Sequence, residues 1–202
     1  MATRWFDAVR NSKTLTIYVD SSAETWRMAL RWARVEFNML AIQNNIPVRL
    51  EFSTTPPNFS PPRGEFADSG ANVLFSATAP AHVFVGRTSF VANGNTLELV
   101  KARITIPTPL VTPPIGKGPS RPAGDFAKAV LAFHELVHAF GLHNEEHTPD
   151  SQPDVFVSQF QSVEWAPNPD DDTVRTGTTN FPIGGVPWLT PRTVNILRAN
   201  WR

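Results

Sequence analysis

Two histidines and a glutamate stand at a spacing that can bind a metal ion and activate water. In His134-Glu135-Leu136-Val137-His138 the histidines are four residues apart. On a helix, residues with this spacing lie one turn above each other, so both rings can reach one zinc ion. In H-E-x-x-H sites the glutamate takes a proton from the activated water and passes it to the leaving amine. The segment therefore predicts amide hydrolysis, with Glu135 as the general base and acid.

The surrounding residues predict the helix that this spacing requires. From Asp125 to Phe140 apolar residues recur every three or four positions and form one buried stripe. Asp125 suits the N-cap, and Gly141 suits the left-handed position after the last turn. At about 100° per residue, both histidines lie roughly a quarter turn from the centre of the stripe, whereas Glu135 projects from the far side. We expect the two imidazoles to converge on one point.

The N-terminal half predicts an α/β fold. Residues 14–20 alternate apolar and polar side chains, residues 21–44 have the period of a long amphipathic helix, and residues 47–52 again have a strand pattern. Ser21 and Glu24 have the form of a capping box. Three more strand patterns follow, at residues 72–75, 82–85 and 97–106. We expect a βαβ unit that is completed into a mixed sheet, in a domain that begins close to residue 14.

Composition excludes several other classes of protein. The 202 residues include 18 basic and 18 acidic side chains, so no net field attracts nucleic acid or an anionic membrane. Cysteine is absent, and any metal must therefore be bound by His, Asp or Glu. No apolar run approaches the roughly 20 residues that span a bilayer, and none near the N-terminus has the length of a signal peptide. We expect a soluble monomer, and the sequence leaves both its compartment and its secretion open.

The residues after the helix resemble those of the metzincin zinc metallopeptidases, especially the matrixin-like members. The family pattern is H-E-x-x-H-x-x-G-x-x-H. This chain matches it at His134, Glu135, His138 and Gly141, and has Asn144 where the family has its third histidine. The resemblance implies a zinc-dependent endopeptidase that hydrolyses the peptide bonds of a protein or peptide substrate.

The third zinc ligand must come from a neighbouring position, because a neutral amide is a poor zinc ligand. We favour His147, which a longer loop after the glycine can bring back to the metal. His143 would have to point the opposite way from the family position in an extended segment. Asn144 itself, an acidic residue and water stay open. In another class of zinc peptidase a glutamate on a following helix is the third ligand, and Glu164 is the nearest candidate, although the prolines around it disfavour a long helix.

The resemblance also implies the fold, a metzincin-like twisted mixed sheet with two long helices and an irregular C-terminal lobe that ends in a helix. Residues 1–202 would form a single catalytic domain, with the sheet and the helices in residues 1–140 and the C-terminal lobe in residues 141–202. No methionine follows the motif, so we expect Ile183 to provide the apolar floor beneath the zinc and residues 188–197 to form the closing helix. Substrate would bind extended beside an edge strand near residues 82–91.

Two further interpretations concern function and a second metal. The displaced third histidine and the missing methionine give an alternative function, a catalytically impaired metzincin-like binding or structural module. The acidic run Asp170-Asp171-Asp172, with Asp150 and Asp154 before it, is a candidate for a structural calcium site of the kind that resembling proteins have. Such a run more often forms a solvated loop.

Overall fold

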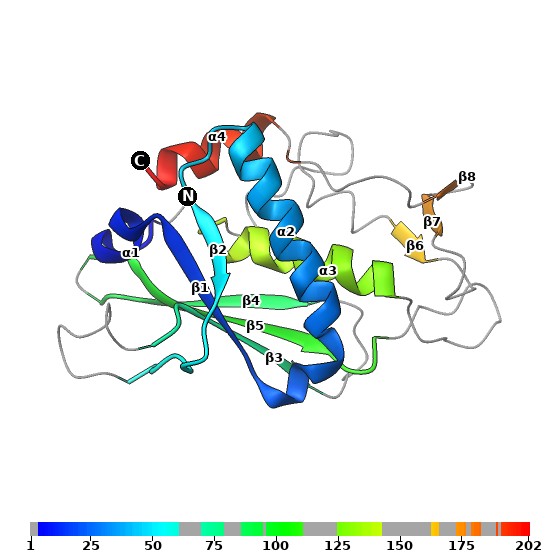
Figure 1. The fold of residues 1–202 in the computed structure, drawn as a ribbon, viewed down its shortest axis with the longest axis horizontal. Coiled ribbons are helices and arrows are strands. Elements are labelled where there is room, and N and C mark those ends of the chain that lie inside the picture. The colour runs from blue at the N-terminus through cyan, green and yellow to red at the C-terminus, as the bar shows by residue number, and fades with distance from the viewer. Residues whose placement is uncertain are drawn as a thin grey trace.

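A mixed sheet and the helices packed against it make up most of the described structure (Figure 1). The computed structural model describes residues 4–60, 70–78, 86–94, 96–110, 125–142, 189 and 191–202, and the backbone of three short strands between residues 163 and 182. The predicted strand at 82–85 lies outside these residues.

The sheet has five strands in the order β2-β1-β3-β5-β4. The strands are β1 (Thr14–Val19), β2 (Arg49–Phe52), β3 (Val73–Thr78), β4 (Arg87–Ala92) and β5 (Leu99–Pro107). Four of them run parallel, whereas β4 pairs antiparallel with β5 and forms one edge of the sheet. The predicted mixed α/β fold is confirmed. Within the predicted edge region 82–91, the strand that the structure describes begins at Arg87.

The long helix after β1 starts differently from its prediction. A 3-10 turn, η1 (Ser21–Trp26), leads into α2 (Arg27–Gln43). Its N-cap is Asp20, whose carboxylate accepts a hydrogen bond from the backbone N–H of Ser22 at 2.9 Å. The predicted capping box is wrong, because Asp20 already caps the turn and the Glu24 carboxylate instead pairs with Arg27 at 2.5 Å.

The buried stripe of α2 joins the sheet to the next helix. Its predicted members are all buried: Trp26, Leu30, Ala33, Phe37 and Leu40. Phe37 stacks on Phe140 with ring centroids 4.1 Å apart, and it contacts Phe133 in a tilted arrangement at 6.4 Å. Phe133 belongs to α3 (Asp125–Ala139), so α2 and α3 share one aromatic core. Asp125, predicted as the N-cap, is the first residue of that helix, and its carboxylate lies 3.2 Å from the Lys128 amine.

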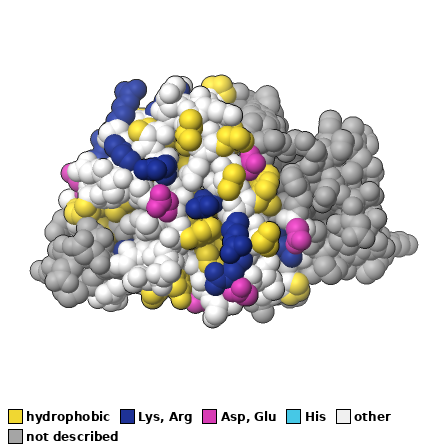
Figure 2. Space-filling view, viewed as in Figure 1, with side chains coloured by type: hydrophobic (Ala, Val, Ile, Leu, Met, Phe, Trp, Pro, Cys, Tyr) yellow, Lys and Arg dark blue, Asp and Glu magenta, His cyan; other side chains and the backbone are white. Residues whose placement is uncertain are grey.

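The outer face of α2 is visible in the space-filling view (Figure 2). Met28, Val35, Met39 and Ile42 are exposed along it. Hydrophobic, basic and acidic side chains are scattered over this face, and among its described residues no broad patch carries a single sign of charge (Figure 2). This mixture agrees with the balanced charge of the sequence.

The N-terminal boundary near residue 14 is wrong, because the residues before it belong to the core. Trp5 is fully buried, and its indole N–H donates to the carbonyl of Ala139 at the end of α3, at 2.9 Å. A short helix, α1 (Asp7–Ser12), separates Trp5 from β1. Apolar periodicity could not show this, since a single buried tryptophan has no period.

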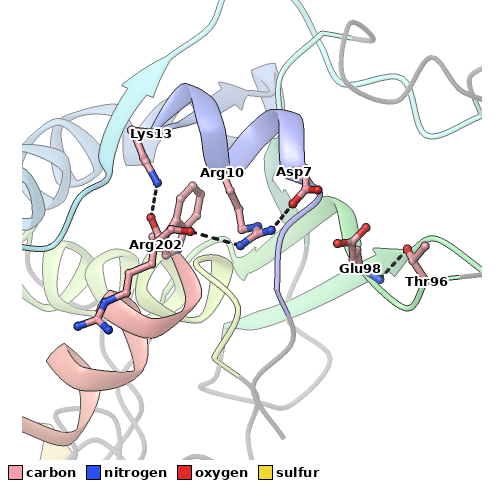
Figure 3. A network of polar contacts seen from close by, with 7 residues as sticks. Asp7, Arg10, Lys13, Thr96, Glu98 and Arg202 are labelled. Carbon is pink, nitrogen blue, oxygen red and sulfur yellow. Dashed lines mark hydrogen bonds and ion pairs between the residues drawn. The ribbon is translucent and has the colours of Figure 1, made fainter.

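A closing helix is present as predicted, but α4 (Pro191–Asn200) begins and ends three residues later than the predicted range 188–197. Trp201 follows it, fully buried, and its indole N–H donates to the carbonyl of Phe140 at 3.2 Å. The backbone carbonyls of Trp201 and Arg202 accept hydrogen bonds from Lys13 and Arg10, at 2.5 and 3.4 Å, so the C-terminus is tied to the N-terminal segment (Figure 3).

The C-terminal lobe contains regular structure that the sequence did not predict. The strands β6 (Val163–Trp165), β7 (Thr173–Thr176) and β8 (Thr179–Pro182) form a three-stranded antiparallel sheet. The lobe is therefore not wholly irregular. Ile183, predicted to form the floor beneath the zinc, lies outside the described residues. Across the part of the chain that is described, no helix combines the length and the apolarity needed to cross a membrane.

Candidate metal centre

The end of α3 buries three polar side chains together. His134, Glu135 and His138 are 8%, 3% and 4% exposed. Glu135 was predicted to project from the side opposite the apolar stripe. That side is in fact covered by β4, so the carboxylate is buried as well. Buried polar groups need polar partners, and the partners of these side chains define the site.

The two histidine rings are neighbours. Their centroids are 4.9 Å apart and their planes meet at 70°. Nδ1 of His138 lies 2.8 Å from the carbonyl oxygen of Leu142. Because a carbonyl only accepts, this contact places the proton of neutral His138 on Nδ1 and the lone pair on Nε2. A carbonyl that fixes the tautomer in this way is typical of histidines that bind zinc through Nε2.

A glycine turn brings that carbonyl to the ring. Gly141 has φ of 103° at the end of α3, as predicted for a residue suited to the left-handed region. Its N–H and that of Leu142 both donate to the carbonyl of His138, at 2.9 and 3.1 Å. The chain therefore reverses, and the Leu142 carbonyl returns to the His138 side chain. Sequence reasoning missed Leu142, although a glycine three residues after a helical histidine was the available signal.

The Glu135 carboxylate contacts the edge strand. Its Oε2 accepts a hydrogen bond from the Thr88 hydroxyl at 2.6 Å, and the same hydroxyl lies 3.2 Å from the Glu135 carbonyl oxygen. Oε1 lies 4.0 Å from Nε2 of His134. Burial raises the pKa of Glu135 to about 7, and the hydrogen bond from Thr88 opposes this increase. Thr88 was not among the predicted site residues, because strand periodicity does not show which helix a strand residue faces.

The described residues include two of the three predicted zinc ligands, His134 and His138. Within the described ranges, no three His, Asp or Glu side chains gather as a metal-binding group. His147, His143 and Asn144 lie outside those ranges, and so do the candidate calcium ligands between residues 150 and 172. Two neighbouring imidazoles, one with its tautomer fixed by a carbonyl, are side chains of a type that suits zinc. The described part of the site therefore fits the ion.

The rival ligand Glu164 has a clear backbone placement. It lies in β6 and pairs with Arg175 of β7. The class of zinc peptidase considered above takes its glutamate from a helix, and this segment is a strand. Glu164 therefore lies in a strand and not on the helix that this class of peptidase requires.

Comparison with known proteins gives likeness to solved structures and no match in sequence. No protein-family profile and no curated protein sequence matches this chain. Among solved structures, that of myroilysin is similar over 98% of this chain and 95% of its own, with 11% identical residues and a TM-score of 0.43. At this TM-score the likeness carries no argument about function. The function proposed below therefore rests on the residues of the site.

Proposed function

We propose that this chain is a zinc-dependent endopeptidase, with the metal bound by His134, His138 and His147. The observation that supports the proposal is the buried group at the end of α3, in which two imidazoles are neighbours and the Glu135 carboxylate lies 4.0 Å from Nε2 of His134. The Nδ1 N–H of His138 donates to the Leu142 carbonyl, which leaves the Nε2 lone pair available for a metal. A helix that needed these residues only for packing would have no use for three buried polar side chains.

The residues of the site have distinct roles in the proposed reaction. Zinc held by His134, His138 and His147 would supply Lewis acidity at this site. Glu135 takes the proton of the attacking water on Oε1, the oxygen that faces His134, and delivers it to the nitrogen of the leaving amine. The hydroxyl oxygen bonds to the scissile carbonyl carbon, and the C–N bond breaks. One water is consumed, and a carboxylic acid and an amine are formed.

The edge strand would hold the substrate. β4 forms an edge of the five-stranded sheet, and it also supplies the Thr88 hydroxyl that contacts Glu135. An extended peptide that pairs with β4 would gain main-chain hydrogen bonds and would lie beside the catalytic glutamate. This arrangement suits a protein or peptide substrate in an extended form.

Two measurements test the proposed function. Zinc content of the purified protein would be determined by atomic absorption, and cleavage of a mixture of internally quenched fluorescent peptides would be followed with and without a chelator. We expect about one zinc per chain, together with cleavage that the chelator abolishes and added zinc restores. Glu135→Ala should keep the zinc and lose cleavage, whereas Glu51→Gln, an exposed change on β2, should keep both. Zinc bound without any cleavage would instead favour the binding or structural module.

A further inference from the structure

The carboxylate of Glu135 occupies a space that β4 and the residue before it leave open. Gly86 directly precedes β4, and a Cβ built at Gly86 would lie 2.5 Å from Oε1 and 2.6 Å from Cγ of Glu135. Real Cβ atoms do not approach other atoms so closely. The side chain of Glu135 therefore fills the room that any side chain at position 86 would need.

The hydroxyl of Thr88 fixes one oxygen of the same carboxylate. The Thr88 hydroxyl donates to Oε2 of Glu135 at 2.6 Å, a distance in the ordinary range for a hydroxyl donor. Thr88 is β-branched, which restricts its rotamers, and its backbone is paired with Ile104 of β5. The donor is therefore held by the sheet. Its position does not depend on α3, the helix that carries Glu135.

The two carboxylate oxygens of Glu135 have different surroundings. Oε2 accepts from Thr88, and Oε1 lies 4.0 Å from Nε2 of His134. A carboxylate has two oxygens, so one can be anchored while the other stays available for proton transfer. Rotation about the last side-chain bond would exchange them, and the Thr88 hydrogen bond opposes that rotation.

We propose that Gly86 and Thr88 are positioning residues for the general base: together they form a seat that holds the Glu135 carboxylate with Oε1 towards the histidine pair. This inference rests on the proposed function, because the seat matters for catalysis only if Glu135 moves a proton. Neither residue touches substrate in this role, and both act through Glu135. Preorganisation of this kind lowers kcat when it is lost, while metal binding and substrate binding are kept.

Three variants of the zinc-loaded protein test the seat. Thr88→Val removes the hydroxyl and keeps the shape, Thr88→Ser keeps the hydroxyl, and Gly86→Ala places a methyl group where the carboxylate lies. For the peptide cleaved fastest by the wild type, we expect Thr88→Val and Gly86→Ala to lower kcat by roughly tenfold to a hundredfold, with KM changed by less than about threefold. Thr88→Ser should recover most of the lost kcat. Zinc content should equal that of the wild type in all three.

Matched controls separate the seat from general damage to the fold. Gly94→Ala is the control for Gly86→Ala, because a Cβ built at Gly94 meets nothing within 4 Å. Thr14→Val in β1 is the control for Thr88→Val. Both should keep the wild-type kcat. Wild-type kcat in Thr88→Val and Gly86→Ala would overturn the seat and leave the proposed function standing.

A second readout does not require catalysis. The free energies of unfolding of the wild type, Thr88→Val, Glu135→Ala and the double variant give the coupling between the two side chains, because each single variant removes one partner of the hydrogen bond. A favourable coupling is expected, and a coupling of zero would overturn the seat whether or not the protein is active. If the coupling is found but no peptide is cleaved, the contact between Thr88 and Glu135 is supported and the proposed function is rejected.

Discussion

His138 and Glu135 lie within one turn of α3, yet their polar partners come from different parts of the chain. The His138 ring is held by the Leu142 carbonyl after the glycine turn, and the Glu135 carboxylate is held by Thr88 of the edge strand. Each contact can therefore be weakened by a substitution outside the motif. The first consequence concerns Gly141, which sets the position of the Leu142 carbonyl.

Gly141→Ala should weaken both folding and zinc binding. An alanine at φ of 103° is strained, so we expect a loss of about 1–3 kcal/mol in the free energy of unfolding of the zinc-free protein. Relaxation of the turn moves the Leu142 carbonyl away from His138, and loss of such a partner typically weakens metal binding about tenfold to a hundredfold. Competition with a chromogenic chelator measures the affinity, and Gly94→Ala is the control. An unchanged zinc affinity would mean that the carbonyl does not orient His138.

The third zinc ligand can be identified by substituting the candidate residues one at a time. His147→Ala should lower zinc affinity by at least about a hundredfold, because removing one of three protein ligands leaves an incomplete site. His143→Ala and Glu164→Ala should retain the metal nearly as well as the wild type. The reverse result, with zinc retained by His147→Ala and lost in His143→Ala, would assign the third ligand to His143.

The packing of α2 on α3 determines the position of the motif as a whole. Phe37 of α2 is fully buried and contacts Phe133 and Phe140, which flank the two histidines in sequence. Phe37→Ala should therefore cost about 3–5 kcal/mol of stability, since it opens a cavity between the helices. Ile42→Ala on the exposed face of the same helix should cost less than about 0.5 kcal/mol. Chemical denaturation measures both, and equal losses in the two variants would contradict a shared aromatic core.

Sequence periodicity predicted the strands and helices whose own apolar residues recur at a regular spacing. The strand at 14–20, the buried stripe of α2 and the helix that carries His134 and His138 were predicted from spacing, and Gly141 from its residue type. Contacts between elements were beyond that method. The burial of Glu135 depends on β4 covering the far side of α3, and the roles of Thr88 and Leu142 depend on chain reversals that periodicity does not describe. The site was thus predicted as far as the histidine spacing, and its supporting contacts came from tertiary structure.

The two ends of the chain meet at the end of the candidate site. The indole N–H groups of Trp5 and Trp201 donate to the successive carbonyls of Ala139 and Phe140, at 2.9 and 3.2 Å. The last carbonyls of a helix have no partner within the helix, and buried ones need donors from elsewhere. Both terminal segments therefore stabilise the C-terminal end of α3, one residue beyond His138. This arrangement makes the stability of the site a property of the whole chain.

A buried lysine gives a prediction about the whole molecule. Lys101 of β5 is fully buried, and its amine donates to the carbonyls of Ala71 and Gly70, at 2.9 and 3.4 Å. Burial lowers the pKa of Lys101 from 10.5 to about 8. Between these two values the unfolded chain binds more protons than the folded one, so stability should increase as pH rises from about 8 to 10.5. A depression of this size corresponds to about 3 kcal/mol.

Urea denaturation across this pH range, done in parallel on the wild type and Lys101→Met, isolates the contribution of this residue. Other groups titrate in both proteins, so the difference between them reports Lys101. The wild type should gain up to about 3 kcal/mol relative to the variant on going from below pH 8 to above pH 10.5. Below about pH 8 the amine is charged in both states, and its burial lowers the stability of the folded protein by the full amount. Above pH 10.5 the amine is neutral in both states, and this penalty is absent. A difference that stays constant with pH would show that Lys101 has an ordinary pKa in the folded protein.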